Sequence, residues 1–306
     1  MVAYLIRRLL QAVLIMIGVS IITFMLLYLL PADPARQVAG RTATAAQVQM
    51  VREQLGLDRP IYEQYGRYVA KLAKGDLGRS FVQRSQVSEL VAARLPATLL
   101  LMLAAIACEL ALGLTVGAIA AFKRNTAFDQ GVMVGAMFFV STPQFLLGYV
   151  LLYVFAVWLG WSPIGGYGQF KHIILPAITL GLLGAGWYAR MMRSTMIEVL
   201  RQDFVRTARA KGLGRGRIVL LHVVPNAILP IIAMIGLDIG YFMSGIVVVE
   251  SVYGWPGIGQ LTWQAIQQID IPIIMGVTLV SACAIVLGNL LADLVAPLID
   301  PRIKLK

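Results

Sequence analysis

The chain has 306 residues, of which 59% are apolar and only 13% are charged, and its mean hydropathy is +0.79. An apolar share this high excludes a disordered chain, and a charged share near half of the usual value of roughly 25% is too small for the surface of a soluble domain. The remaining class is an integral membrane protein. The net charge of +11 therefore has to be assigned to one side of a membrane before it is interpreted as nucleic-acid binding.

Six stretches of the chain are long and apolar enough to cross a bilayer, whose core of about 30 Å needs about 20 residues of helix. The first stretch follows Arg7 and Arg8, as a signal peptide would, but it exceeds the roughly 7–15 apolar residues of a signal sequence, so we expect a retained anchor. The third contains Pro143, which predicts a kink. The predicted spans of this all-α protein are Leu9–Leu30, Ala97–Phe122, Gln130–Leu159, Ile173–Arg190, Ile228–Val249 and Ile273–Val295.

The short loops distribute Lys and Arg unequally, and cytoplasmic loops carry the excess of these residues. One side holds both chain ends, Lys123 and Arg124, and a basic cluster between Arg190 and Arg217, whereas the short loops of the other side hold Lys171 alone. We therefore expect a multi-pass protein of the inner (cytoplasmic) membrane with both termini in the cytoplasm. Most of the basic residues are explained by the orientation of the chain in the membrane, and no soluble domain carries a cluster of them. We therefore expect no nucleic-acid partner.

The loop after the first span is the only sizeable outer segment, and it carries helix signals. Thr44 and Gln47 have capping-box spacing before a helix that we expect to end at Gly56. A second helix is predicted over 60–75, and a third, short helix over Val87–Arg94. These helices are interpreted as a small cap on the outer face of the spans, and contact of this cap with a soluble partner stays an open alternative.

The inner loop 191–226 is strongly basic and is predicted to contain an amphipathic helix. Its apolar side chains form one stripe, and Gly212, Gly214 and Gly216 break the helix before a second short segment that ends at Pro225. Two interpretations stay open: a basic helix lying on anionic membrane lipid, or a docking helix for another protein. The stripe consists of Ile197, Leu200, Phe204 and Ala208.

The last outer loop, Glu250–Leu261, is rich in glycine and proline, which predicts a tight, non-helical backbone. Tyr253 and Trp255 suit a membrane interface. Non-helical backbone near a bilayer needs shelter from protein or from a water-filled cavity, so a folded-back segment at a pore mouth and a simple turn anchored by aromatic residues are both open. The residues of the predicted outer gate are Glu250, Trp255, Pro256, Gly257 and Gly259.

The inner loop also resembles the coupling signature of importer permeases of the ATP-binding cassette (ABC) class. That signature reads Glu-Ala-Ala, three residues, Gly, nine residues, Ile, one residue, then Leu-Pro. Ala208, Gly212 and Pro225 match it. Arg206 and Thr207 depart from it, as does His222 at the position of Ile.

Further segments resemble the dipeptide, oligopeptide and nickel branch of these permeases, so that the resemblance spans nearly the whole chain. The chain is most similar to the first permease of such systems, of the dipeptide or glutathione type. The segments are Asp203–Leu213, Leu30–Pro34, Gly75–Gly78, Trp255–Gly259 and Ile299–Arg302.

The resemblance implies a type I ABC importer permease that forms half of a translocation path for peptides. Its implied partners are a second homologous permease, two cytoplasmic ATP-binding subunits, an extracytoplasmic substrate-binding protein and membrane lipid. The chain contains no Gly-Lys pair, which a phosphate-binding loop needs, so ATP and Mg would be used by the partner ATPases, and no cofactor is expected on this chain. The alternatives are a secondary transporter that works without an ATPase, and a nickel or opine importer permease of the same family.

The implied organisation is a first transmembrane helix over 1–30, an extracytoplasmic helical loop over 31–94, a permease core over 95–299 with the coupling loop 191–226, and a cytoplasmic tail over 300–306. In the coupling loop, Gly212 would allow a sharp turn where a side chain would clash, and Pro225 would fix the re-entry into the fifth span. The residues with an implied role in coupling to the ATPase are Asp203, Arg206, Thr207, Ala208, Arg209, Gly212, Arg215 and Pro225.

Three acidic residues lie inside predicted spans: Asp293 near the cytoplasmic end, where we expect a structural role, and Glu109 and Asp238 deeper in the membrane. A charge at the centre of a membrane helix costs roughly 2.5–3.5 kcal/mol, so both should face protein or water rather than lipid. Asp238 is the better candidate for the translocation path, where it would attract the ammonium group of a peptide; the alternative is a buried polar contact with a neighbouring span. No catalytic residue and no metal site are expected, and His172 and His222 lie on opposite sides of the predicted membrane.

Overall fold

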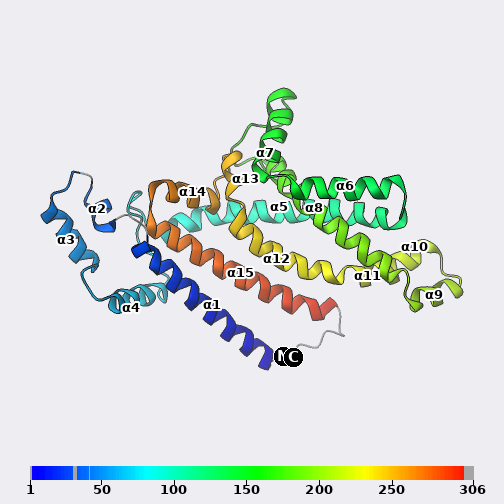
Figure 1. Ribbon diagram of the computed structural model, residues 1–306, viewed down its shortest axis with the longest axis horizontal. Coiled ribbons are helices and arrows are strands. Elements are labelled where there is room, and N and C mark those ends of the chain that lie inside the picture. Colours follow the sequence, from blue (N-terminus) through cyan, green and yellow to red (C-terminus); the bar gives the residue numbers. More distant parts are fainter. Residues whose placement is uncertain (1, 30–32, 41, 300–306) are drawn as a thin grey trace. The chain divides into compact units, whose positions relative to one another are not determined.

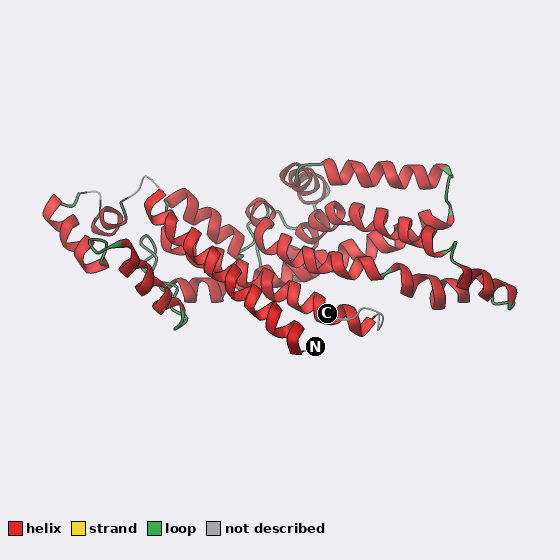
Figure 2. Cartoon of the chain, turned by 60° about the horizontal axis from the view of Figure 1, so that its bottom comes forward, coloured by secondary structure: helices red, strands yellow, loops and turns green. Residues whose placement is uncertain are grey.

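A computed structural model describes residues 2–29, 33–40 and 42–299 of the chain; the predicted tail 300–306 and the start of the Leu30–Pro34 segment lie outside them. Within these ranges the structure consists of helices joined by loops, without a strand, which confirms the all-α expectation (Figure 1; Figure 2). Two π-helical segments cover Tyr153–Trp158 and Val219–Val223. The α-helices are α1 (Val2–Leu29), α2 (Pro34–Ala39), α3 (Ala45–Leu55), α4 (Ile61–Leu72), α5 (Val87–Phe122), α6 (Ala127–Ser141), α7 (Gln144–Leu152), α8 (Phe170–Val199), α9 (Asp203–Ala210), α10 (Arg215–Ile218), α11 (Val224–Ala227), α12 (Leu229–Gly245), α13 (Val247–Val252), α14 (Ile258–Gln268) and α15 (Ile271–Ile299).

Four of the described helices are individually long and apolar enough to cross a membrane: α5, α8 and the stretches Ile6–Met25 of α1 and Ile271–Leu291 of α15. Two bent helix pairs pass the same test together, which gives up to six spans among the described residues. The first pair, α6 with α7 and its π-helical extension, bends by 103°. The predicted kink at Pro143 is confirmed, because this residue stands directly before α7 and has no backbone N–H to continue the helix.

Helix α3 begins and ends where its capping residues predict, whereas α4 begins at the predicted place but ends at Leu72, before Gly75. The hydroxyl of Thr44 accepts the backbone N–H of Gln47, and the side chain of Gln47 accepts that of Thr44. Gly56 ends α3 in the left-handed conformation, with φ of +69°. α4 begins directly after Pro60.

The predicted short helix over Val87–Arg94 is wrong as a separate element. α5 begins at Val87 but continues through Pro96 into the second span. A proline removes one backbone hydrogen bond from a helix, and the neighbouring side chains of Val91 and Ala97 are buried. Packing on both sides of the proline therefore holds the helix together, and no loop separates the outer segment from the second span.

The described residues form two compact units. The first contains those up to Thr98 together with Pro256–Leu287. In this unit α4 packs on α1, where the ring of Phe24 contacts Tyr65 edge-on and stacks on Tyr68. Helix α4 of the predicted cap therefore rests on the first span.

Asp270 fastens the loop 79–86 to the junction between α14 and α15. Its carboxylate is fully buried and accepts a hydrogen bond from the hydroxyl of Ser80. It also accepts hydrogen bonds from the backbone N–H groups of Phe81 and Val82, each at 3.2 Å. A carboxylate that accepts several hydrogen bonds at once is well satisfied in the interior. This cluster explains how a loop with little helix keeps a defined position.

Ser80→Ala should loosen this loop without unfolding the chain. The variant removes the hydrogen bond from the Ser80 hydroxyl to Asp270 and the one that this hydroxyl accepts from the N–H of Gln83 at 2.8 Å. The bond to the charged acceptor alone is worth about 1.5 kcal/mol in local stability, which corresponds to at least roughly tenfold faster opening-limited cleavage of the loop 79–86 in limited proteolysis. Ser85→Ala is the matched control, because the hydroxyl of Ser85 bonds only to the carbonyl of Gln83 within the same loop. Equal cleavage rates of the two variants would contradict the prediction.

The second unit contains Leu99–Trp255 and the part of α15 from Gly288. α5 and α8 pack closely in this unit, because Gly117 of α5 has no side chain to hold them apart. A Cβ atom at this position would lie only 2.5 Å from the carbonyl oxygen of Ala189 in α8. Glu109 lies two turns before Gly117 on the same side of α5. The close approach thus places the carboxyl of Glu109 beside α8.

Candidate functional site

The predicted coupling loop contains more helix than expected. α8 continues to Val199, so the first part of 191–226 extends the fourth span. A break at 200–202 separates α8 from α9. The single apolar stripe from Ile197 to Ala208 is therefore wrong, because the break restarts the helical register.

α9 buries a narrow apolar face and exposes its charges. Val205 and Ala208 are buried in a core with side chains of α8 and α10, whereas Phe204 is 43% exposed, contrary to its place in the predicted stripe. Arg206 and Asp203 form an ion pair at 3.8 Å, but both side chains are almost fully exposed, so the pair adds little stability. Thr207 and Arg209 are exposed as well. The outward side of α9 is thus a charged ridge.

Gly212 ends α9 in a Schellman motif. Its backbone N–H donates to the carbonyl of Arg209 at 3.0 Å, and the N–H of Leu213 donates to the carbonyl of Ala208 at 3.3 Å. This motif requires a left-handed residue, and Gly212 has φ of +74°. A Cβ atom there would meet no atom within 4 Å, so the glycine is needed for its backbone angle and not for space inside this chain.

Pro225 lies where the chain turns into α12. It follows the π-helical segment Val219–Val223, and the helix around it meets α12 at an angle of 46°. Proline cannot donate a backbone hydrogen bond and crowds the preceding turn, and a wider π-helical turn relieves that conflict. Pro225 thus stands at the start of the fifth predicted span.

Arg209 and Arg215 border a hollow of about 390 Å³ beside α9. The guanidinium of Arg215 lies 5.8 Å from the centre of the Phe122 ring at the end of α5. Two cations at one hollow suit an anionic group from a partner protein or from a lipid headgroup.

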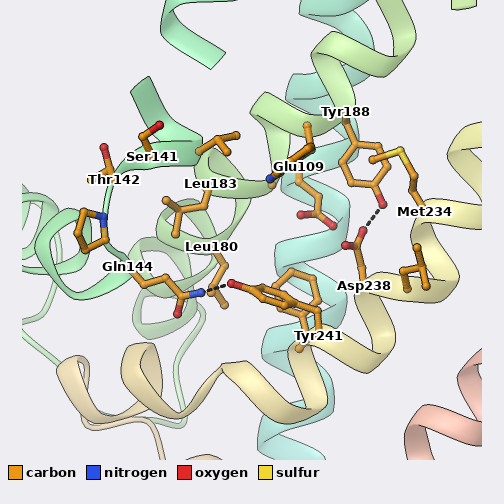
Figure 3. Close-up of a pocket in the computed structure, with 16 residues that line it drawn as sticks. Glu109, Ser141, Thr142, Gln144, Leu180, Leu183, Tyr188, Met234, Asp238 and Tyr241 are labelled. Atoms are coloured by element: carbon orange, nitrogen blue, oxygen red, sulfur yellow. Dashed lines mark hydrogen bonds between the residues drawn. The ribbon is translucent and has the colours of Figure 1, made fainter. Parts of the chain in front are cut away.

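Two of the three acids in the predicted spans, Glu109 and Asp238, converge on one cavity. Glu109 from α5 and Asp238 from α12 both line a cavity of about 510 Å³, and the hydroxyl of Tyr188 from α8 donates a hydrogen bond to the carboxylate of Asp238 (Figure 3). This contact confirms that Asp238 faces protein. The other lining residues are Val140, Ser141, Thr142, Pro143, Gln144, Leu180, Leu183, Gly184, Trp187, Met234, Leu237, Tyr241 and Phe242.

Glu109 occupies space that a glycine leaves open. A Cβ atom on Gly184 of α8 would collide with the carboxylate of Glu109. Glu109 is only 1% exposed, and its Oε1 atom has no hydrogen-bond partner among the described residues. A buried acceptor without a donor is unfavourable, which marks this carboxyl as a candidate ligand-binding group.

The aromatic residues of the Glu250–Leu261 segment are buried inside the protein, so they do not anchor a turn at the lipid interface. The hydroxyl of Tyr253 bonds to that of Thr179 at 2.8 Å and donates to the carbonyl of Gly148 at 3.0 Å. Trp255 is 1% exposed, and its backbone N–H donates to the carbonyl of Glu250 at 2.8 Å. Burial raises the pKa of Tyr253 above its usual value.

The predicted non-helical stretch is shorter than expected. α14 begins at Ile258, so Gly259 lies in a helix, and Gly257 is its N-terminal cap. The N–H of Ile258 donates to the hydroxyl of Thr98 at 2.8 Å. Only the stretch from Tyr253 through Gly257 is irregular, because the hydroxyl of Thr98 caps α14 and lets the helix begin directly after it.

Sequence reasoning missed the ion pair between Asp129 and Arg193. The guanidinium of Arg193 in α8 contacts both carboxylate oxygens of Asp129 in α6, at 2.5 and 2.7 Å, and the Asp129 side chain is 3% exposed. The carboxylate also accepts the N–H of Asn125 at 2.9 Å. Thr126, three residues before Asp129, had capping spacing, but nothing local pointed to Arg193.

Two family profiles match the chain and together cover almost all of it. The profile described as "Binding-protein-dependent transport system inner membrane component" matches residues 113–305. The profile described as "Binding-prot-dependent transport system membrane comp, N-term" matches residues 1–102.

Relatives match along the full length. The glutathione transport system permease proteins GsiC of Escherichia coli K12 and Salmonella paratyphi A are each 39% identical over 306 residues, which is 100% of both chains. One chain of the MetNI methionine ABC transporter, solved in inward-facing conformations, is similar in fold, with a TM-score of 0.58 at 18% identity over 69% of this chain and 96% of that chain.

Proposed function

The chain belongs to the family of binding-protein-dependent transport system inner membrane components, and we propose that it forms half of the translocation path for glutathione or small peptides. It is a multi-pass permease subunit of the inner membrane with the fold of a type I ABC importer permease. The observation that carries the substrate proposal is the 39% identity to glutathione permeases over the whole chain. Membership of this family replaces the alternative of a secondary transporter.

The cavity around Glu109 and Asp238 is the proposed part of the path. Its volume of about 510 Å³ lies within the range of roughly 300–1,000 Å³ that small-molecule sites occupy. Aromatic and hydroxyl side chains share its wall, as in sites that orient a polar organic molecule. This chain would contribute one side of the path and a second homologous permease the other.

The energy would come from two cytoplasmic ATP-binding subunits, where ATP and Mg are used. The charged ridge of α9 supports the proposal that this segment docks on such a subunit. Val205 and Ala208 fix one face of α9 in the protein core, and the charged side chains of the opposite face are exposed. Closure of the ATPases would push α9, and the packed core would pass the movement to α8. The docking surface would comprise Asp203, Arg206, Thr207, Arg209, Gly212 and Arg215.

A substrate-binding protein would deliver the substrate at the opposite face. In this arrangement both chain termini would be cytoplasmic, and the segment from Glu250 at the end of α13 to Gly259 at the start of α14 would form an outer gate. The close packing of this segment supports a gate that moves as a rigid piece, because Tyr253 and Trp255 tie it to the protein interior.

The deciding experiment is co-purification followed by reconstitution. A tagged chain, expressed with its neighbouring subunits, should elute with a second permease and two ATPase subunits, and glutathione-loaded binding protein should stimulate ATP hydrolysis and uptake into liposomes. A chain that transports alone without ATP, or a complex whose ATP hydrolysis does not respond to any loaded binding protein, would refute the proposal.

A further inference from the structure

Two carboxyl groups and no basic side chain line the cavity of the second unit. The carboxyl groups are those of Glu109 and Asp238. Arg190 of α8 is not among the lining residues, and its guanidinium lies over the ring of Trp187 at 4.4 Å from the centroid. Ionisable side chains inside a membrane protein pair with one another or mark a substrate pathway.

The two carboxyl groups differ in how their own chain satisfies them. Asp238 accepts a hydrogen bond from the hydroxyl of Tyr188. Glu109 is 1% exposed, and its Oε1 atom has no donor among the residues that the structure describes. The two carboxyls lie close enough to interact directly, so a single donor placed between them would contact both.

The rest of the cavity suits an organic cation that belongs to a polar molecule. The ring of Tyr188 lines the cavity beside Asp238, and aromatic rings attract cations. At the other end, Gln144 bonds to the hydroxyl of Tyr241, and Thr142 supplies a further hydroxyl (Figure 3). The cavity therefore has carboxyl groups at one end and neutral polar groups at the other.

We propose that Glu109 and Asp238 together bind the protonated amino group of the transported substrate, with Tyr188 as the positioning residue of Asp238. An ammonium group has three N–H donors and a positive charge, so it satisfies both carboxyls at once. The inference rests on the proposed function and narrows it to substrates that keep a free amino group. The described residues contain no cluster of three or more His, Cys, Asp or Glu side chains that could hold a metal ion.

The test measures binding to the assembled complex of this chain, the second permease and the ATPase subunits in nanodiscs, without the binding protein. The probes are glutathione and N-acetylglutathione, which differ at the amino group. The wild-type complex should bind the acetylated probe about tenfold more weakly or worse, as expected for the loss of a charged hydrogen bond.

Variants test whether Glu109 and Asp238 cause the preference for glutathione over N-acetylglutathione. Glu109→Gln and Asp238→Asn keep the shape of the cavity and should bring the affinity ratio close to one. Gly184→Ala should lower the ratio with both acids present, because its Cβ displaces the carboxylate of Glu109. Glu89→Gln is the matched control: it removes an exposed carboxylate from the first turn of the same helix and should leave the ratio unchanged.

Equal binding of both probes to the wild-type complex, a preference that survives Glu109→Gln, or binding of neither probe would overturn the amine site. ATP-driven uptake of glutathione by the same complex with its binding protein is measured alongside. If uptake is normal and the preference is absent, the amine site falls and the proposed function stands. If no ATP-driven uptake occurs and no ATPase co-elutes, the proposed function falls.

Discussion

Gly212→Trp is expected to reduce ATP-driven import by about tenfold or more while leaving the amount of chain in the membrane unchanged. Gly212 has φ of +74°, an angle that costs a bulky residue about 1–3 kcal/mol. The indole would also project from the charged ridge of α9, where no atom of this chain lies within 4 Å of the new Cβ. The strain and the added bulk both fall on the proposed docking surface.

The measurement compares uptake, ATP hydrolysis and membrane abundance of the variant in the same preparation. Gly212→Asn is the matched control, since asparagine tolerates the left-handed conformation at the end of a helix; it should keep import within about twofold of the wild type. Normal import by Gly212→Trp would rule out α9 as the docking segment. A defect in membrane abundance instead would show that the turn serves folding.

Gly117→Leu should lower the free energy of unfolding by about 3 kcal/mol, the upper part of the usual range for overpacking. A Cβ atom at this position would lie 2.5 Å from the carbonyl oxygen and 2.9 Å from the Cα atom of Ala189 in α8. These are backbone atoms, so no side-chain rotation relieves the clash, and α5 and α8 would have to separate. The cavity that these helices enclose with α12 would open with them.

SDS titration of the purified chain in mixed micelles measures this loss. Gly135→Leu on α6 is the control, because its Cβ would meet no atom within 4 Å; it should change the unfolding free energy by less than about 0.5 kcal/mol. Similar losses in the two variants would mean that leucine itself, and not the contact between α5 and α8, causes the effect.

The helix ends and breaks were predictable because their causes are local. The capping box of Thr44 and Gln47, the left-handed Gly56 and the break at Pro143 all depend on side chains within a few residues of the backbone groups that they satisfy or deprive. The hydropathy of a membrane span is likewise a property of one continuous stretch of residues, so the number of candidate spans could be predicted. The failed expectation at Val87–Arg94 had a tertiary cause: packing around Pro96 carries α5 across a residue that usually ends a helix.

The amphipathic stripe shows where local periodicity fails. Leu200 and Phe204 are correctly spaced for one helix, but the chain breaks between α8 and α9, and Val205 becomes the buried residue. A single-residue change of register moves the buried face by about 100°. The position of such a break depends on what the second helix packs against, which the pattern of the sequence does not contain.

By itself, the sequence determined that this protein is an all-helical membrane permease, where its helices are capped, and that Glu109 and Asp238 must avoid lipid. Only the tertiary structure decided that these two acids share one cavity, that Gly184 makes room for one of them, and that Asp129 meets Arg193, 64 positions away. The physical reason is range. Solvation and capping act on neighbouring residues, whereas the approach of distant side chains follows from how helices pack, and that depends on the shapes of all their faces at once.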